Sequence, residues 1–290
     1  WQEESAKKRM VAECNDGFMI DVRRFLKGDE ESLKAFAERM RRNPKGSGLI
    51  NYIASHDGFT LCDLVSYEER HNEDNGEQNR DGRVQNYSWN CGAEGPSRKK
   101  AIVELRKKQI RNALMLLLLS QGTPCLLAGD EFGNTQKGNN NVYCQDNETA
   151  WLNWNKKKMN EALFEYVRTL IQFRKEHTSL HKEMPLLGMD KTACGLPDIS
   201  FHGELAWQTP AAVYSRQLGV LYCDNEAKQD TCYIAYNMHW LKHTFALPSL
   251  PKGKKWYRVM DTATETCGEK LEEMQKAVRL DERSIVVLCG

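Results

Sequence analysis

Acidic side chains directly follow two short hydrophobic segments of the sequence. His56 and Asp57 come after GLINYIAS, and Asp130 and Glu131 come after TPCLLAG. Such segments are typical of parallel strands that are buried on both faces. In a (β/α) barrel the carboxyl ends of the strands face the active site, so these four side chains are candidates for binding or catalysis. A His-Asp pair alone is also compatible with a buried histidine that only satisfies backbone groups.

A long polar stretch, residues 67–100, lies between these segments. Its central part, HNEDNGEQNRDGRVQNYSWNCGAEG, is rich in amides and acids. Such groups hydrogen bond to sugar hydroxyls, while an aromatic ring covers the apolar face of the sugar. A solvated loop is the simpler interpretation of the composition, and calcium is a third, although the spacing of an EF-hand is absent. Tyr87 and Trp89 argue against disorder in this stretch.

The segments around these candidates alternate between helical and strand patterns, which predicts βα units and a parallel sheet. Hydrophobic residues recur at helical spacing in three segments, residues 31–42, 101–119 and 160–176. After His181 the pattern changes to short alternating segments, which predict an antiparallel β domain. We therefore expect one domain over residues 1–182 and a second over residues 183–290.

Composition limits the partners. Lys and Arg total 41 against 40 for Asp and Glu, so the chain has no excess charge with which to attract nucleic acid or an anionic membrane. The longest hydrophobic run, residues 113–119, is too short to cross a bilayer. The sequence begins with Trp1 rather than Met, and we expect its true N-terminus to be missing.

The ten cysteines are scattered and form no C-x-x-C pair, so no zinc or redox motif is predicted. We expect reduced thiols in a cytoplasmic protein, no bound metal and no cofactor. A disulfide framework is the alternative, since the number of cysteines is even.

Several long motifs resemble the bacterial glycogen-debranching and isoamylase branch of the α-amylase family. They are NYIASHDGFTLCDLVSYEERHNEDNGEQNRDG, NYSWNCGAEGPS and SQGTPCLLAGDEFGNTQKGNNNVYCQDNETAWLNW. The segment MVAECNDGFMIDVRRFLKGD resembles the sixth barrel strand and the stretch after it, and ISFHG, YSRQLGV and YIAYNMHW resemble the C-terminal sandwich. The resemblance extends over nearly the whole chain from Ala12 onward.

The resemblance implies a fold that is α/β plus all-β: the C-terminal part of a (β/α)8 TIM barrel, strands six to eight with their helices, and then an antiparallel β-sandwich. It implies a retaining hydrolase that cleaves α-1,6 branch points of an α-glucan such as glycogen, starch or limit dextrin. By analogy Asp57 grips hydroxyls of the distorted sugar and favours the oxocarbenium-like transition state, and His56 donates to a neighbouring hydroxyl. The family's nucleophile and acid/base motifs are not found in this sequence, so we expect the chain alone to be inactive.

The resemblance also suggests which polar residues contact the glucan. The candidates are His56, Asn79, Arg80, Asp81, Trp89, Asn90, Asp130 and Glu131. Two other interpretations remain open: a non-catalytic glucan-binding or regulatory module, and a transglycosylase or branching enzyme of the same superfamily. The incomplete barrel would leave strand edges unpaired, which predicts self-association.

Overall fold

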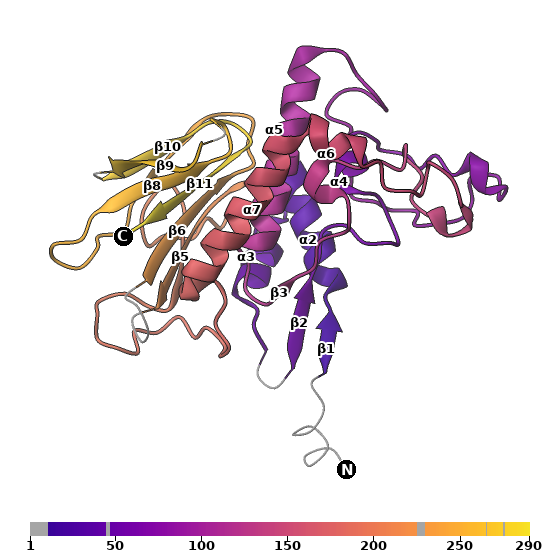
Figure 1. Ribbon diagram of the computed structural model, residues 1–290. Coiled ribbons are helices and arrows are strands. Elements are labelled where there is room, and N and C mark those ends of the chain that lie inside the picture. The colour runs from indigo at the N-terminus through magenta and orange to yellow at the C-terminus, as the bar shows by residue number, and fades with distance from the viewer. Residues whose placement is uncertain (1–10, 45–46, 225–229, 265, 275) are drawn as a thin grey trace, which may run out of the picture.

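Three parallel strands form the sheet of the N-terminal half. The computed structural model describes residues 11–44, 47–224, 230–264, 266–274 and 276–290. β1 (Ala12–Cys14) pairs with β2 (Gly48–Asn51), and β2 pairs with β3 (Thr123–Pro124), so β2 is central. All three strands run in the same direction (Figure 1).

Helices connect these strands, as the alternating pattern predicted. α2 (Asp16–Lys27) and α3 (Leu33–Arg41) lie between β1 and β2, and α4 (Leu61–Leu64), η1 (Glu73–Asn75) and α5 (Lys100–Leu118) lie between β2 and β3. The segment after β3 contains η2, η3, α6, α7 and η4, over Asp130–Phe132, Val142–Cys144, Asn155–Met159, Glu161–Glu176 and Thr178–Leu180. The three helices predicted from hydrophobic spacing are confirmed as α3, α5 and α7.

The strands are shorter than the hydrophobic segments that predicted them. We expected strands over residues 48–55 and 123–128, whereas β2 ends at Asn51 and β3 ends at Pro124. Beyond Asn51, the carbonyl of Ile53 accepts hydrogen bonds from a side chain, Arg23, instead of from a neighbouring strand. Pro124 has no N–H to donate to a ladder. The hydrophobic residues that follow β2 are buried without being part of the sheet.

The C-terminal half is built on an antiparallel sheet of six strands, in the order β4-β5-β6-β11-β8-β9. These strands span Ile199–His202, Gln217–Asp224, Asp230–Asn237, Ser284–Cys289, Trp256–Asp261 and Thr266–Met274. A separate pair, β7 (His243–Ala246) and β10 (Ala277–Leu280), is also antiparallel. The predicted antiparallel β region is therefore confirmed, and the predicted boundary after residue 182 stays a prediction.

Alternate residues of the six-stranded sheet face two hydrophobic clusters. On β5, Leu218, Val220 and Tyr222 face the helices of the N-terminal half, and Leu221 and Cys223 face the β7–β10 pair. This alternation is the period of two that a sheet covered on both faces requires. One continuous core thus joins the helices to the sheet.

Aromatic rings fill the centre of that continuous core. Phe25 and Phe36 stack with ring centroids 3.9 Å apart, and Tyr236 of β6 meets Phe36 edge-on at 5.2 Å. The hydroxyl of Tyr222 donates to the carbonyl of Met40 at 3.0 Å. The two halves of the chain are therefore packed directly against each other, with α3 against β5 and α5 against β11.

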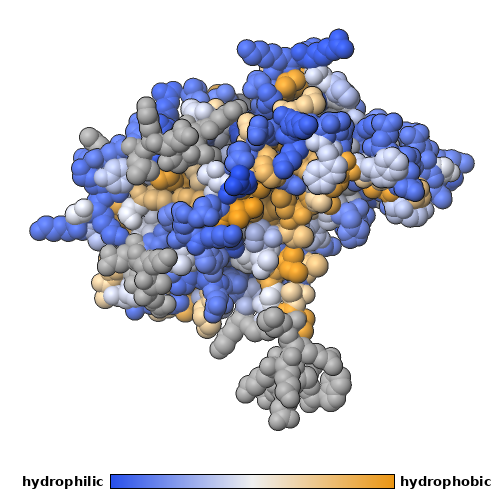
Figure 2. All heavy atoms as spheres, viewed as in Figure 1, coloured by the Kyte–Doolittle hydropathy of each residue, from blue (hydrophilic) through white to orange (hydrophobic). Residues whose placement is uncertain are grey.

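Hydrophobic residues also reach the surface near β1. All three residues of β1 are exposed, and Val11 just before it is 61% exposed. The space-filling view shows hydrophobic side chains over this part of the molecule (Figure 2). None of the helices in the described ranges is long and hydrophobic enough to cross a membrane.

Candidate functional site

Asp57 and Arg83 form an ion pair beyond the carboxyl end of β2. The Nη2 atom of Arg83 lies 2.9 Å from Oδ2 of Asp57, and Nε of Arg83 donates to the same oxygen at 3.0 Å and to the Asp57 carbonyl at 3.1 Å. The Asp57 side chain is 46% exposed and His56 beside it is exposed. The carboxylate is therefore oriented by a cation and still open to a ligand.

Arg23 of α2 fixes the backbone on both sides of this pair. Its Nε donates to the carbonyl of Ile53 at 2.8 Å, and its Nη1 donates to the carbonyl of Asn86 at 2.8 Å. Ile53 shortly precedes Asp57, and Asn86 shortly follows Arg83, so one guanidinium holds both segments. Arg23 is 1% exposed, and its burial together with the charge of Arg83 lowers its pKa to about 10. It remains a cation at neutral pH.

Glycine and a helix cap shape the turn after Asp57. Gly58 has a φ of +141°, a conformation that residues with a side chain rarely adopt. The chain then enters α4, where the Oγ1 atom of Thr60 accepts a hydrogen bond from the backbone N–H of Asp63 at 3.1 Å. The turn thereby directs the chain away from the sheet directly after the His56-Asp57 pair.

Asp130 connects the segment after β3 to the segment after β2. Its Oδ1 accepts a hydrogen bond from the backbone N–H of Leu61 at 2.9 Å, and its side chain is 1% exposed. Burial, together with the neighbouring carboxylates of Asp63 and Glu131, raises the pKa of Asp130 to about 8. The two acidic pairs lie beyond the carboxyl ends of adjacent parallel strands, at the same end of the sheet. Neither pair follows its strand directly as we expected, because β2 ends at Asn51 and β3 ends at Pro124.

The local contacts of the second acidic pair are structural. Asp130 bonds to the start of α4, and Oε2 of Glu131 accepts from the backbone N–H of Gly129 at 2.8 Å. The carboxylate of Asp130 is buried and that of Glu131 is held within its own turn. The contact of Asp130 and Glu131 with substrate stays a prediction. Their hydrogen bonds show that they support the two loops.

Amide side chains join the loop after β2 to the loop after β3. Together with the carboxylate of Asp81, which accepts hydrogen bonds from two of them, they form a group that we call the amide scaffold. It comprises Asn72, Asn75, Asp81, Asn86, Asn139, Asn140 and Asn141. The Nδ2 atom of Asn140 donates to the carbonyl of Arg83 at 2.9 Å and to Oδ1 of Asn86 at 2.8 Å. The Nδ2 atom of Asn72 donates to Oδ1 of Asn140 at 2.8 Å, and Oδ1 of Asn72 accepts from the backbone N–H of Asn140 at 2.9 Å. The scaffold thus holds the backbone of the residue that pairs with Asp57.

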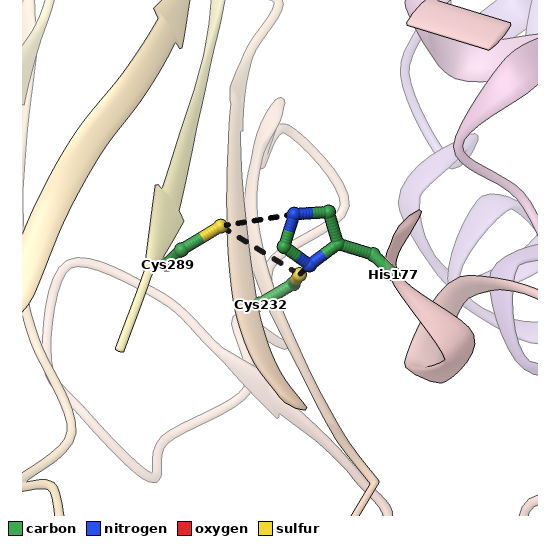
Figure 3. Close-up of side chains that lie close together, drawn as sticks. All are labelled: His177, Cys232 and Cys289. Carbon is green, nitrogen blue, oxygen red and sulfur yellow. Dashed lines mark hydrogen bonds between the residues drawn. The ribbon is translucent and has the colours of Figure 1, made fainter. Parts of the chain in front are cut away.

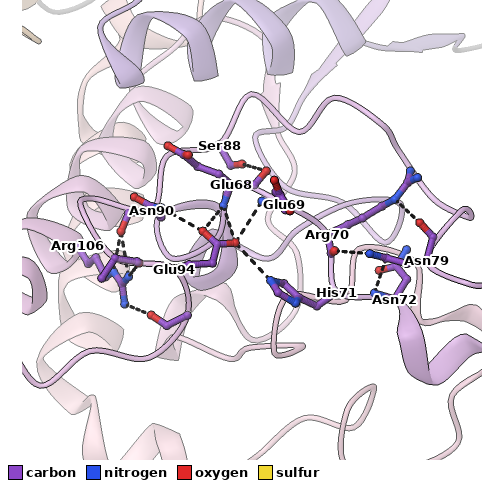
Figure 4. A network of polar contacts seen from close by, with 12 residues as sticks. Glu68, Glu69, Arg70, His71, Asn72, Asn79, Ser88, Asn90, Glu94 and Arg106 are labelled. Atoms are coloured by element: carbon purple, nitrogen blue, oxygen red, sulfur yellow. Dashed lines mark hydrogen bonds and ion pairs between the residues drawn. The ribbon is translucent and has the colours of Figure 1, made fainter.

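Three of the predicted sugar-binding residues take part in the folding of these loops. Asp81 accepts hydrogen bonds from Asn75 and Asn141 within the amide scaffold, both at 2.8 Å. Asn79 accepts from the backbone N–H of Asn72 at 2.9 Å. Figure 4 shows Asn79 at one side of the loop and Asn90 at the other, where Nδ2 of Asn90 donates to Glu94 at 3.0 Å.

The other two residues of that prediction lie differently. Arg80 is exposed, and its Nη2 donates to Oε1 of Gln78 at 2.5 Å. Trp89 is partly buried against the core, with the guanidinium of Arg283 4.7 Å from its ring. Arg80 is thus free to reach a ligand, whereas the ring of Trp89 is engaged by Arg283 on one face.

Arg83, Arg23 and Asn140 were not among the residues predicted from the sequence. Arg83 comes close after Asp81 in the string NRDGR, so it was inside the loop that suggested sugar binding. A polar loop contains several such residues, and no local spacing distinguishes the one that folds back 26 positions onto Asp57. Arg23 lies on α2, in the segment that resembles the sixth barrel strand and the stretch after it, and no role was predicted for it.

One family model matches the C-terminal part of this chain, and known proteins match most of its length. Residues 212–290 match the family model described as "Isoamylase, C-terminal". The "Glycogen operon protein GlgX homolog" of Haemophilus influenzae is 49% identical over 188 residues, which are 59% of this chain and 28% of that protein. "Isoamylase 1, chloroplastic" of Arabidopsis thaliana is 38% identical over 266 residues, 87% of this chain and 32% of that protein. The chain thus spans about a third of the length of these relatives.

Solved structures show the same fold. A pullulanase from Bacillus acidopullulyticus superposes with a TM-score of 0.67 at 18% identity, covering 97% of this chain and 30% of the pullulanase. A type I pullulanase from Bacillus subtilis, complexed with maltose, gives a TM-score of 0.67 at 17% identity, covering 96% of this chain and 35% of the pullulanase. At these identities the likeness establishes the arrangement of the backbone.

Proposed function

We propose that this chain, which belongs to the glycogen-debranching and isoamylase branch of the α-amylase family, forms part of the active site of a retaining debranching hydrolase. It corresponds to a C-terminal portion of the enzymes of that branch. The substrate is an α-1,6 branch point of glycogen or starch. The observation that carries the proposal is the Asp57–Arg83 pair, exposed beyond the carboxyl end of the parallel strand β2. This is where barrel enzymes place their reactive groups.

Asp57 acts on the sugar ring at the point of cleavage. Its carboxylate accepts hydrogen bonds from ring hydroxyls, and it strengthens these bonds as the ring flattens and gains positive charge in the transition state. Arg83 binds Oδ2 and the backbone carbonyl of Asp57, so the carboxylate keeps one orientation while substrate enters. A group that is already oriented need not reorganise during the reaction, which lowers the barrier.

His56 and Arg80 extend the contact to neighbouring hydroxyls. Both are exposed, and both have N–H groups that a sugar oxygen accepts. Retaining hydrolysis further needs a nucleophile and an acid with their carboxyl groups about 5 Å apart. We assign these two groups to parts of the intact enzyme other than this chain, so residues 1–290 alone do not cleave the bond.

Product analysis tests this proposal. The chain alone and the intact protein that contains it are incubated with pullulan and glycogen, free of host amylases. We expect the intact protein to release linear chains with the α configuration retained, as proton NMR of the fresh products shows, and the chain alone to release none. Transfer of chains to new branch points would instead identify a branching enzyme. Binding without products from the intact protein would identify a glucan-binding module.

A further inference from the structure

Three metal-binding atoms come together at the interface between the two halves of the chain. They belong to His177, Cys232 and Cys289. Their ligand atoms all lie within 4.8 Å of one another. His177 directly follows α7, Cys232 lies on β6 and Cys289 lies on β11, in register with Cys232. Figure 3 shows the imidazole pointing at both sulfur atoms. No other group of this kind is found in the described residues.

Two of the three distances between these atoms are close to those around one tetrahedral ion. The two Sγ atoms are 3.9 Å apart, and Nε2 of His177 is 3.9 Å from Sγ of Cys289. Bonds of about 2.3 Å to sulfur and about 2.0 Å to nitrogen at tetrahedral angles place such ligands roughly 3.5–3.8 Å apart. The Sγ atom of Cys232 lies 3.4 Å from Nδ1 of His177, and the three ligand atoms lie within 4.8 Å of one another. The imidazole must therefore move for Nε2 and both sulfur atoms to share one first coordination shell.

We propose that His177, Cys232 and Cys289 bind one thiophilic cation, with zinc as the physiological choice. Two thiolates and one imidazole are the ligand types that zinc prefers, and harder cations such as magnesium and calcium prefer oxygen. Cys232 is fully buried, but His177 and Cys289 are partly exposed. The cation therefore enters from the exposed side, and a solvent molecule completes its shell.

Asp230 orients the imidazole for this role. Its Oδ1 lies 2.6 Å from Nδ1 of His177, and its Oδ2 accepts from the backbone N–H of Ser179 at 2.9 Å. A carboxylate that binds one ring nitrogen of a histidine fixes the tautomer in which the other nitrogen carries the lone pair. Nδ1–H is then donated to Asp230, and Nε2 faces Cys289. Asp230 is a positioning residue that acts through His177.

A disulfide between the two cysteines is the competing outcome. Directly opposed residues of an antiparallel pair have Cβ atoms about 4.5–5.5 Å apart, whereas a disulfide holds them about 3.8 Å apart. The strands would have to approach each other to close the bond. A bound metal ion does not require the two strands to approach each other. It also explains why His177 and Asp230 lie beside the two cysteines.

Cobalt(II) titration tests the site, since thiolate-bound cobalt has an intense charge-transfer absorption. The reduced chain is freed of metal with a chelator and titrated with cobalt, and zinc is then added in competition. We expect absorption that saturates near one equivalent and is displaced by zinc. It should be lost in Cys289→Ser and His177→Gln and kept in the controls Cys144→Ser and Cys223→Ser. Zinc should raise the unfolding temperature of the wild type by several degrees and leave that of Cys289→Ser unchanged.

Three results would overturn the proposal. The first is the absence of the absorption band in the wild-type chain. The second is a band of equal intensity in folded Cys289→Ser, with folding confirmed by circular dichroism, since the metal would then be held by other cysteines. The third is a Cys232–Cys289 disulfide, found by peptide mass spectrometry in protein that was purified without added oxidant and alkylated at once.

Discussion

The guanidinium of Arg83 lies 2.9 Å from the carboxylate of Asp57, although 26 residues separate the two in the sequence. Neither residue belongs to a regular element. Their contact depends on Arg23, which binds the backbone beside each of them, and on Asn140, which binds the carbonyl of Arg83. The site is therefore built by buried polar side chains that bridge loops.

Removing the guanidinium of Arg83 should impair turnover in the intact protein. Arg83→Met leaves Asp57 without its orienting cation, and we expect kcat to fall about 10- to 100-fold because the carboxylate must then reorganise in each turnover. In the double variant with Asp57→Asn, the loss should be much smaller than the product of the two single losses. Steady-state kinetics on glycogen limit dextrin measure both effects, and multiplicative losses would show that the two residues act independently.

The amide scaffold should contribute measurably to stability. Asn140→Ala removes the Nδ2 group that donates hydrogen bonds to the side-chain oxygen of Asn86 and to the carbonyl of Arg83. Leaving buried polar groups unpaired costs about 1–3 kcal/mol in the free energy of unfolding. Urea unfolding of this chain measures the change. The matched control is Asn155→Ala at an exposed position, for which we expect a change within about 0.5 kcal/mol.

Stability should fall with rising pH through the titration of Asp130. Its pKa is about 8 in the folded chain against 3.8 for an ordinary aspartate. Between these two pKa values the folded state holds a proton that the unfolded state has released. The contribution of Asp130 to the free energy of unfolding is therefore complete below about pH 4, and it is lost progressively as the pH rises to about 8. A single group contributes a slope of about 1.4 kcal/mol per pH unit in this window.

The variant Asp130→Asn isolates that contribution. It removes the titrating group and keeps an oxygen for the N–H of Leu61, so we expect its stability to exceed that of the wild type increasingly from pH 5 to pH 8. Asp74→Asn, at an exposed position, should leave the pH dependence unchanged. Parallel pH profiles for the wild type and Asp130→Asn would refute the assignment.

The chain alone should self-associate through the exposed side of its parallel sheet. Among the residues that the structure describes, β1 is paired on one side only, and Val11 next to it is 61% exposed. Unpaired strand edges with hydrophobic side chains promote pairing between molecules, and lysine on an edge prevents it. Light scattering should show dimers or larger species that Val11→Lys reduces and the loop control Val84→Lys does not. A monomer at all concentrations would contradict this prediction.

The helices, and the position of Asp57 after a buried strand, could be predicted because the sequence patterns that indicate them involve only neighbouring residues. α5 and α7 have hydrophobic residues at helical spacing, and the hydrophobic segment before His56 indicated that a buried strand precedes Asp57. The strand lengths were wrong because the end of β2 depends on Arg23, a side chain from another element. Arg83 and the His177 cluster could not be found, since they form only when distant segments pack together.

Steady-state kinetics of Asp57→Asn in the intact protein test the central claim most directly. The exchange keeps the size of the side chain and removes its charge, and an interaction made mainly in the transition state affects kcat and kcat/KM together. We predict that both constants fall at least about 100-fold on an α-1,6-branched glucan, while the matched exchange Asp74→Asn changes neither. A variant whose KM rises while kcat stays unchanged would contradict the account, because Asp57 would then bind the substrate in its ground state only.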